Sequence, residues 1–202
     1  MGRVIARPFV GANGGFTRTA NRRDFSLEPP ALTVLDLLNN ASVDTVSVGK
    51  VDDLFAGRGL NRKIHTKSNA EGTKEIIEES AKMKSGLLFA NLVDFDMLYG
   101  HRNDPRGFAD ALQTFDCELP RILETIGNDD LLFLTADHGN DPVTPSTDHS
   151  REYVPLLCFS RSKQTGVNLG TRSTFADIGK TLADYFQVEN SLAGTSFLGE
   201  VF

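Results

Sequence analysis

The sequence predicts an α/β fold in which a mostly parallel sheet is flanked by helices. Short apolar runs typical of buried strands, such as Leu87 to Val93 and Leu131 to Leu134, alternate with longer amphipathic stretches along the 202-residue chain. Strands that alternate with helices in this way usually lie parallel, with helices on both faces of the sheet. Acidic and imidazole side chains follow both runs directly, at the sheet edge where α/β proteins bind their ligands.

Residues 1–30 are expected to be mostly irregular. Residues 3–10 alternate like a strand, which Pro8 would confine to a sheet edge. Because this strand starts at Arg3 with no evident hairpin partner, we expect that sequence is missing upstream. Segment 11–16 is rich in glycine and typical of a turn. The arginines after it form either a solvated basic loop or an arm that binds an anion: Arg18, Arg22 and Arg23.

Beyond residue 30 the spacing of apolar residues predicts a regular series of elements. These are a helix at 30–40, a strand at 43–48, a loop with a short turn at 52–69, a helix at 71–84, a strand at 87–93, a helix at 105–126, strands at 131–134 and 154–160, and a helix at 174–186. Lys50, just after a strand, either reaches a phosphate or carboxylate or is a plain surface lysine. Pro120 should kink or interrupt its helix, and Ser173 or Thr174 could cap the last one.

The composition is that of a soluble globular protein, with 40% hydrophobic and 24% charged residues. The net charge of −6 provides no basic surface for nucleic acid. No segment is apolar for long enough to span a membrane, and the N-terminus does not resemble a signal peptide, so we expect a cytoplasmic protein. The cysteines, Cys117 and Cys158, are expected to be buried and reduced.

Histidine and aspartate residues gather after the two apolar runs. The chain has four histidines, and all but His65 lie in these segments. An Asp-His pair in a loop is often only a solvated turn or a helix cap. Two strand ends that each carry such residues can converge on one edge of a parallel sheet, however, and we therefore predict a metal site there. Its candidate ligands are Asp96, His101, Asp137, His138 and His149.

This ligand set is larger than a single ion needs, because one catalytic ion typically takes about three protein ligands. Two neighbouring ions would suit phosphoryl transfer, since together they stabilise the attacking and the leaving oxygen. No nearby hydroxyl has an obvious activating base. The reaction could therefore be hydrolysis by a metal-bound water, or transfer through a phosphorylated residue outside this chain.

Longer motifs resemble a known family. The segments GRVIARPF (2–9), NLVDFD (91–96), TADHGNDP (135–142) and STDHSREYVP (146–155) are similar to those of phosphopentomutases, a family of the alkaline phosphatase superfamily. The resemblance implies an alkaline phosphatase-like core and interconversion of ribose 1-phosphate, or deoxyribose 1-phosphate, with the 5-phosphate. It also implies two Mn²⁺ ions and a sugar bisphosphate activator.

The resemblance assigns roles to individual residues. Asp96, His101 and His149 would hold one ion, and Asp137 and His138 the other, together with an N-terminal aspartate. The nucleophile would be a threonine in the N-terminal half of the family's sequence. The positions that match substrate contacts are Arg3, Ile5 and Lys50.

Family members are about twice as long as this chain, and the resemblance therefore places it in the C-terminal half. Residues 1–30 would be the remnant of a cap domain and the hinge, and residues 31–202 the second half of the metal-binding core. We expect such a chain to lack mutase turnover, to bind one ion well and the second weakly, and to self-associate through an exposed sheet edge. The alternatives are another phosphomutase or a phosphohydrolase of the same superfamily, and a non-catalytic metal-binding module.

Overall fold

A three-stranded parallel sheet lies at the centre of the α/β body. The computed structural model describes residues 3–19, 21, 23–163 and 166–202. Strand β5 (Thr45–Val48) pairs on one side with β6 (Arg62–Ile64) and on the other with β7 (Leu87–Ala90), both in parallel. All four β5 residues are buried, so this strand forms the middle of the core.

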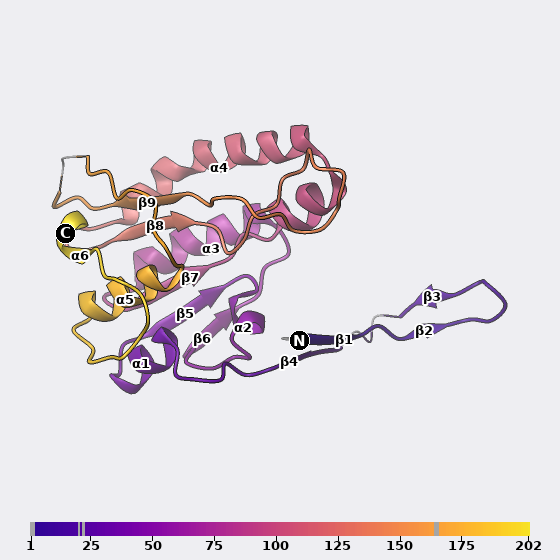
Figure 1. Ribbon diagram of the computed structural model, residues 1–202, viewed down its shortest axis with the longest axis horizontal. Coiled ribbons are helices and arrows are strands. Elements are labelled where there is room, and N and C mark those ends of the chain that lie inside the picture. Colours follow the sequence, from indigo (N-terminus) through magenta and orange to yellow (C-terminus); the bar gives the residue numbers. More distant parts are fainter. Residues whose placement is uncertain (1–2, 20, 22, 164–165) are drawn as a thin grey trace.

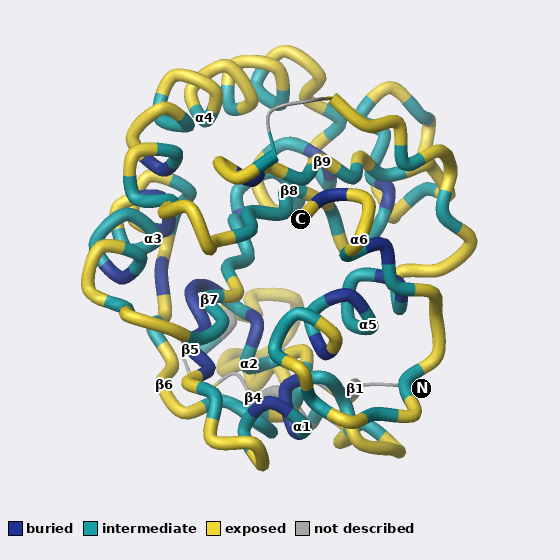
Figure 2. Tube along the Cα trace, turned by 90° about the vertical axis from the view of Figure 1, so that its left-hand side faces the viewer, coloured by how far each residue is buried: buried dark blue, intermediate teal, exposed yellow. Residues whose placement is uncertain are grey.

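Helices cover both faces of this sheet (Figures 1 and 2). On one face α3 (Asn69–Lys82) packs against β5 and β7 and carries α4 (Pro105–Thr125) on its outer side. On the other face α1 (Val34–Asn40) packs against β5 and α5 (Ala176–Tyr185). The short helices are α2 (Val51–Leu54), after β5, and α6 (Leu198–Val201), beside α5. The predicted α/β class with a mostly parallel sheet is confirmed.

A second sheet completes the body. Strands β8 (Leu132–Thr135) and β9 (Leu156–Phe159) pair antiparallel, and neither is hydrogen-bonded to a strand of the parallel sheet. Figure 2 shows β8 and β9 above β5, β6 and β7. The body thus contains two separate blocks of strands.

The N-terminal residues form a narrow ribbon that extends away from the body (Figure 1). Strand β1 (Arg3–Ala6) pairs with β4 (Arg23–Ser26), and β2 (Phe9–Val10) pairs with β3 (Thr17–Arg18), both antiparallel. The expectation of a strand without a hairpin partner was therefore wrong. Its partner follows the glycine-rich turn, where short polar segments hide the strand signal.

Other local predictions also need correction. Strand β6 lies inside the predicted loop at 52–69, because its sequence is short and polar. Helix α4 is not interrupted and runs through Pro120. Cys117 is exposed rather than buried, whereas Cys158 is partly buried, and both thiols are free. The N-cap of α5 is Phe175, although the Thr174 hydroxyl accepts a hydrogen bond from the Ala176 N–H.

Among the described residues, no helix has the length and apolar character needed to cross a membrane.

A buried carboxylate anchors the C-terminal segment to α5. Asp177 accepts hydrogen bonds from the Thr195 backbone N–H and from Arg172 Nε, each at 2.8 Å. The hydrogen bond from the Thr195 N–H holds the pKa of Asp177 below its ordinary value. Burial opposes this effect, and Arg172 adds to it. The ionised carboxylate is therefore the form that the fold stabilises.

Replacing Asp177 with asparagine should lower the free energy of unfolding by about 1–3 kcal/mol at neutral pH, because the half-buried guanidinium of Arg172 loses the charge of this buried carboxylate. Since the folded-state pKa is depressed, this stabilisation is present above the unfolded pKa of about 3.9 and is lost as the pH falls through the folded value. Urea unfolding at pH 7 and at successively lower pH measures both effects. Asp184→Asn, an exposed aspartate of the same helix, is the matched control. An equal loss in both variants would contradict the prediction.

Candidate metal centre

The loop after β8 returns to its own starting point. Gly139 and Ser150 form an antiparallel bridge, and the Ser150 N–H donates to the Gly139 carbonyl at 3.0 Å. This closure brings His149 back beside His138, with ring centroids 3.7 Å apart and ring planes 18° from parallel. A side chain at Gly139 would place its Cβ 2.5 Å from the Ser150 carbonyl oxygen, so the closure requires glycine there.

The segment after β7 supplies the opposing side of the site. It continues into a π-helical turn, η1 (Phe95–Tyr99), followed by a 3₁₀ turn, η2 (Gly100–Arg102). These turns present Asp96 and His101 at the sheet edge that Asp137 and His138 reach from β8. Isolated π turns are rare and occur frequently at functional sites. The predicted strand at 87–93 ends early, at Ala90, and these turns begin after Asp94.

The candidate ligands lie together, with Asp96 in the middle. Its two carboxylate oxygens lie 3.3 Å from His101 Nε2 and from His149 Nε2. One donor atom each from Asp96, His138 and His149 fall within 4.8 Å of one another, a spacing at which they could share a metal ion. Asp137 is half exposed, and its carboxylate lies 3.7 Å from His138 Nε2.

This arrangement differs from the two ligand sets that the resemblance implies. The structure groups His138 with Asp96 and His149, whereas the resemblance pairs His138 with Asp137. His101 approaches the group through Asp96, and its ring stacks on that of His149 with centroids 5.0 Å apart. The assignment of ligands to two ions therefore stays a prediction.

Backbone carbonyls orient two of the imidazoles. His101 Nδ1 lies 2.5 Å from the Thr147 carbonyl oxygen, and His138 Nδ1 lies 3.2 Å from the Gly139 carbonyl oxygen. Because a carbonyl only accepts, the Nδ1 nitrogen carries the hydrogen in each ring. When such a ring is neutral, its Nε2 carries a lone pair, and this lone pair faces a carboxylate oxygen. A cation between the nitrogen and the oxygen would stabilise this arrangement. The donor set thus fits a divalent ion such as Zn, Mn or Fe.

One positioning residue escaped the sequence reasoning. The Asn140 side-chain amide donates to Asp96 Oδ1 at 2.7 Å and so links the loop after β8 to η1. Gly100 packs directly against this amide, where any side chain would collide with it. The signal was present, because Asn140 directly follows the Asp-His-Gly segment. Its role depends on a contact with Asp96, 44 residues away in the sequence.

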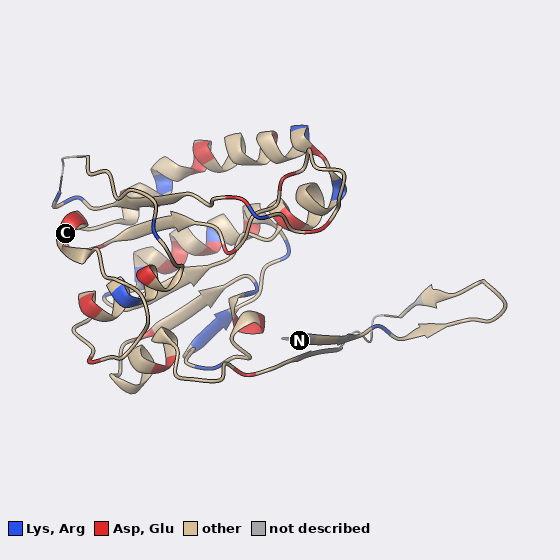
Figure 3. Ribbon diagram, in the orientation of Figure 1, with Lys and Arg blue, Asp and Glu red and all other residues tan. Residues whose placement is uncertain are grey.

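Three hydroxyls of the loop are engaged in its own structure. The Ser150 hydroxyl accepts from the Asp141 N–H, Ser146 accepts from the Asp148 N–H, and Thr144 donates to the Asp141 carbonyl. Asp94 caps α3 by accepting from the Asn69 N–H at 2.7 Å. None of these hydroxyls is paired with a base that could activate it. Acidic residues recur in the loops at this end of the body (Figure 3), which favours a bound cation.

Of the predicted substrate-contacting residues, only Lys50 has a described side chain. It follows β5, and its ammonium contacts the Met97 sulfur on η1, so Lys50 reaches the same edge as the candidate ligands. Arg3 and Ile5 lie on β1, and their side chains fall outside the described part of the structure. The role of each stays a prediction.

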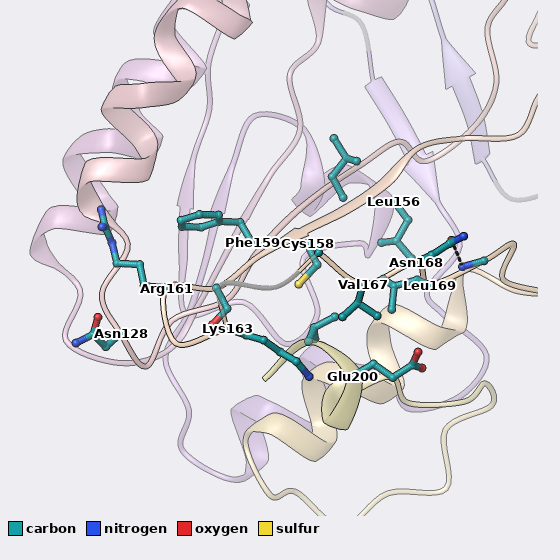
Figure 4. A pocket seen from close by; sticks show the side chains of 15 residues that line it. Asn128, Leu156, Cys158, Phe159, Arg161, Lys163, Val167, Asn168, Leu169 and Glu200 are labelled. Atoms are coloured by element: carbon teal, nitrogen blue, oxygen red, sulfur yellow. Dashed lines mark hydrogen bonds between the residues drawn. The ribbon is translucent and has the colours of Figure 1, made fainter.

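A hollow of about 810 Å³ lies beside β9, lined in part by Cys158, Arg161 and Lys163 (Figure 4). Arg161 is already committed to the carbonyls at the end of α4, including that of Leu123 at 2.7 Å. Burial raises the pKa of the Cys158 thiol to about 11, so it stays protonated at neutral pH and is a poor nucleophile. This hollow therefore offers no reactive group comparable to the imidazole cluster.

Comparison with known proteins places the chain among metal-dependent enzymes. The family model of the metalloenzyme superfamily matches residues 12–190. Proteins named phosphopentomutase are 57% identical in Dictyoglomus thermophilum and 55% identical in Caldanaerobacter subterraneus subsp. tengcongensis, over the whole of this chain. The chain spans about half the length of these relatives, 51% in both cases.

A solved structure supports the fold. The PH0037 protein from Pyrococcus horikoshii superposes with a TM-score of 0.59 over 89% of this chain and 59% of its own, at 16% sequence identity. At that identity the likeness concerns the fold alone.

Asn140→Ala should weaken binding of a divalent cation, with Mn²⁺ as the probe, by about 10–100-fold, because Asp96 loses the hydrogen bond that orients its carboxylate. Calorimetric titration of the metal-free chain measures the affinity. Asn128→Ala, an exposed asparagine beside the β9 hollow, is the matched control. Unchanged affinity in the Asn140 variant would show that Asp96 does not need this contact.

Proposed function

Because the chain belongs to the metalloenzyme superfamily, whose model matches residues 12–190, we propose that it is the metal-binding part of a phosphopentomutase. The reaction is the interconversion of ribose 1-phosphate, or deoxyribose 1-phosphate, with the corresponding 5-phosphate. The observation that carries this proposal is 52–57% identity to phosphopentomutases over essentially the entire chain. The clustering of the candidate ligands at one sheet edge gives it a chemical basis.

The candidate ligands would hold two Mn²⁺ ions. Asp96, His101 and His149 form one set, and Asp137 and His138 contribute to the other, which an aspartate outside this chain would complete. Manganese bound there would offset the charge of the phosphate and stabilise the attacking and leaving oxygens. Within the chain, the Thr147 carbonyl aims His101 and the Asn140 amide aims Asp96. These contacts position the donor atoms without the help of an ion.

The nucleophile lies outside this chain, as a threonine that carries the phosphoryl group between the two positions of the sugar. The hydroxyls of Thr144, Ser146 and Ser150 are bound to backbone partners, which supports this assignment. A sugar bisphosphate would prime the threonine. The chain alone is then expected to bind metal without turning over the sugar phosphate.

The N-terminal ribbon belongs to a substrate-covering cap in this proposal. Residues 1–30 form its remnant and the hinge, and Arg3, Ile5 and Lys50 contact the phosphosugar. The exposed aromatic side chains of Phe9 and Phe16 support the cap assignment, because they have little of the body to pack against. Such an enzyme would act in the nucleotide metabolism of the cytoplasm.

A chimera tests the reaction. Substituting this chain for the matching half of the Dictyoglomus thermophilum phosphopentomutase should give a protein that interconverts ribose 1-phosphate and ribose 5-phosphate, because the two sequences are 57% identical there. A coupled assay measures turnover, with phosphoglycerate and a generic phosphomonoester as competing substrates. Preferential turnover of either competitor would favour another mutase or a hydrolase of the superfamily.

Within that chimera, His149→Ala should reduce turnover by more than about a hundredfold, since loss of a ligand exceeds the effect of losing a residue that only orients one. His65→Ala is the matched control, because His65 is exposed and, in the described part of the chain, pairs with Asp52 alone, at 3.5 Å. Equal activity of the two variants would remove His149 from the site.

Titration of Mn²⁺ into the metal-free chain should show one ion bound at least about tenfold more tightly than a second, because one ligand set is complete and the other lacks a carboxylate. Asp96→Asn should weaken the tighter ion, and the exposed Asp184→Asn should not. Two sites of equal affinity would contradict the proposed division of ligands.

A further inference from the structure

The outer limb of the loop after β8, residues 143–149, lies at the surface. Thr144 is partly buried, and the other residues of this limb are exposed. In the described part of the chain, two side chains from outside the loop make hydrogen bonds to residues 143–148. His101 Nδ1 meets the Thr147 carbonyl, and the Asn103 amide nitrogen donates to the Thr144 carbonyl at 2.8 Å. Because packing holds this limb only weakly, its place depends on these two contacts.

Asn103 has the backbone that this contact requires. It directly follows η2 in the left-handed region, with φ 50° and ψ 47°, which asparagine and glycine adopt at lower cost than other residues. Its backbone N–H closes the turn by donating to the Gly100 carbonyl at 3.1 Å. Because a carbonyl only accepts, the amide of Asn103 turns its nitrogen toward Thr144. The orientation of this side chain is therefore fixed by the chemistry of its partner as well as by the turn.

The other end of the same amide is unsatisfied. Asn103 Oδ1 is buried and has no hydrogen-bond partner among the described residues. A buried acceptor without a donor destabilises the folded chain, and a left-handed backbone at a residue other than glycine also costs stability. The net contribution of this side chain to stability is therefore small. What the contact does provide is a fixed position for the outer limb.

The outer limb in turn positions two candidate ligands. Its Thr147 carbonyl keeps the hydrogen of His101 on Nδ1. Its last residue, His149, stacks on the His101 ring with centroids 5.0 Å apart, and its Nε2 lies 3.3 Å from Asp96 Oδ1. A displacement of the limb would change both the nitrogen of His101 that carries the hydrogen and the distance of His149 from Asp96. Asn103 thus acts on both imidazoles through the segment that positions them.

We propose that Asn103 is a positioning residue of the metal centre. Its amide holds the Thr144 carbonyl, so that the Thr147 carbonyl leaves His101 Nε2 free to bind a divalent cation and His149 stays within reach of the same site. The proposal rests on the metal site of the proposed function, and not on the phosphosugar reaction.

Asn103→Gly tests the proposal, because glycine keeps the left-handed backbone and removes the amide. With Mn²⁺ as the probe, calorimetric titration of the metal-free chain should show an affinity about 10–100-fold weaker than that of the unaltered chain. Gln187→Gly is the matched control, because Gln187 also has a left-handed backbone, with φ 55°, just after α5. Its affinity should be that of the unaltered chain. Equal affinity of the two variants would overturn the proposal.

The tautomer of His101 separates positioning from a general loss of structure. Nitrogen chemical shifts, measured by NMR in the metal-free chain at a pH where the ring is neutral, show which nitrogen carries the hydrogen. The hydrogen should lie on Nδ1 in the unaltered chain and move partly to Nε2 in Asn103→Gly, because the Thr147 carbonyl is displaced. A weaker affinity with an unchanged tautomer would leave Asn103 a structural role alone and would overturn the proposal.

Asn103→Asp provides a second variant if the glycine variant does not fold. It keeps the shape of the side chain but turns an acceptor toward the Thr144 carbonyl, so Mn²⁺ binding should weaken at least about tenfold. Binding as tight as in the unaltered chain, or tighter, would contradict the proposal. Neither readout depends on turnover, so this inference can fail while the proposed activity stands, and the reverse.

Discussion

The contact between the loop after β8 and the turns after β7 is the constraint on which the rest of the site depends. Among the described strands the two blocks share no hydrogen-bonded ladder, and the loops join them at this edge. The Asn140 amide reaches Asp96, the Asn103 amide reaches the Thr144 carbonyl at 2.8 Å, and His101 meets the Thr147 carbonyl. The same bonds that connect the blocks also orient the candidate ligands. The bonds that stabilise this joint therefore also determine the geometry of the site.

This coupling has an electrostatic side. The carboxylate of Asp96 faces Nε2 of His101 and of His149, and lone pairs on these nitrogens would repel it, so the cluster is held by the Asn140 amide and by the carbonyls that orient the imidazoles. A divalent ion would turn these mutual repulsions into shared attraction, and would cross-link the loop after β8 to η1. Metal binding would then tighten the joint between the blocks as well as prepare the chemistry.

Much of this arrangement could be predicted from the sequence, and the failures have physical causes. The apolar runs predicted the main strands and the long helices, and the Asp and His residues after two of them indicated the sheet edge at which the candidate ligands gather. Strand β6 was missed because Arg62–Ile64 is short and polar, and its place in the sheet comes from pairing with β5. The role of Asn140 depends on a contact with a residue distant in sequence. The π turn at Phe95–Tyr99 has no known signature in local composition.

The ribbon formed by β1 to β4 stands apart from all these couplings. Its strands pair with one another, and its aromatic contact, between Phe9 and Phe16 with centroids 5.0 Å apart, lies within the ribbon itself. Substitutions at its tip and substitutions around Asp96 should therefore combine additively, because they share no neighbours. The length and shape of this arm could therefore change while the imidazole edge stays as it is. Under the proposed function, the part that recognises the substrate would evolve independently of the part that handles phosphate.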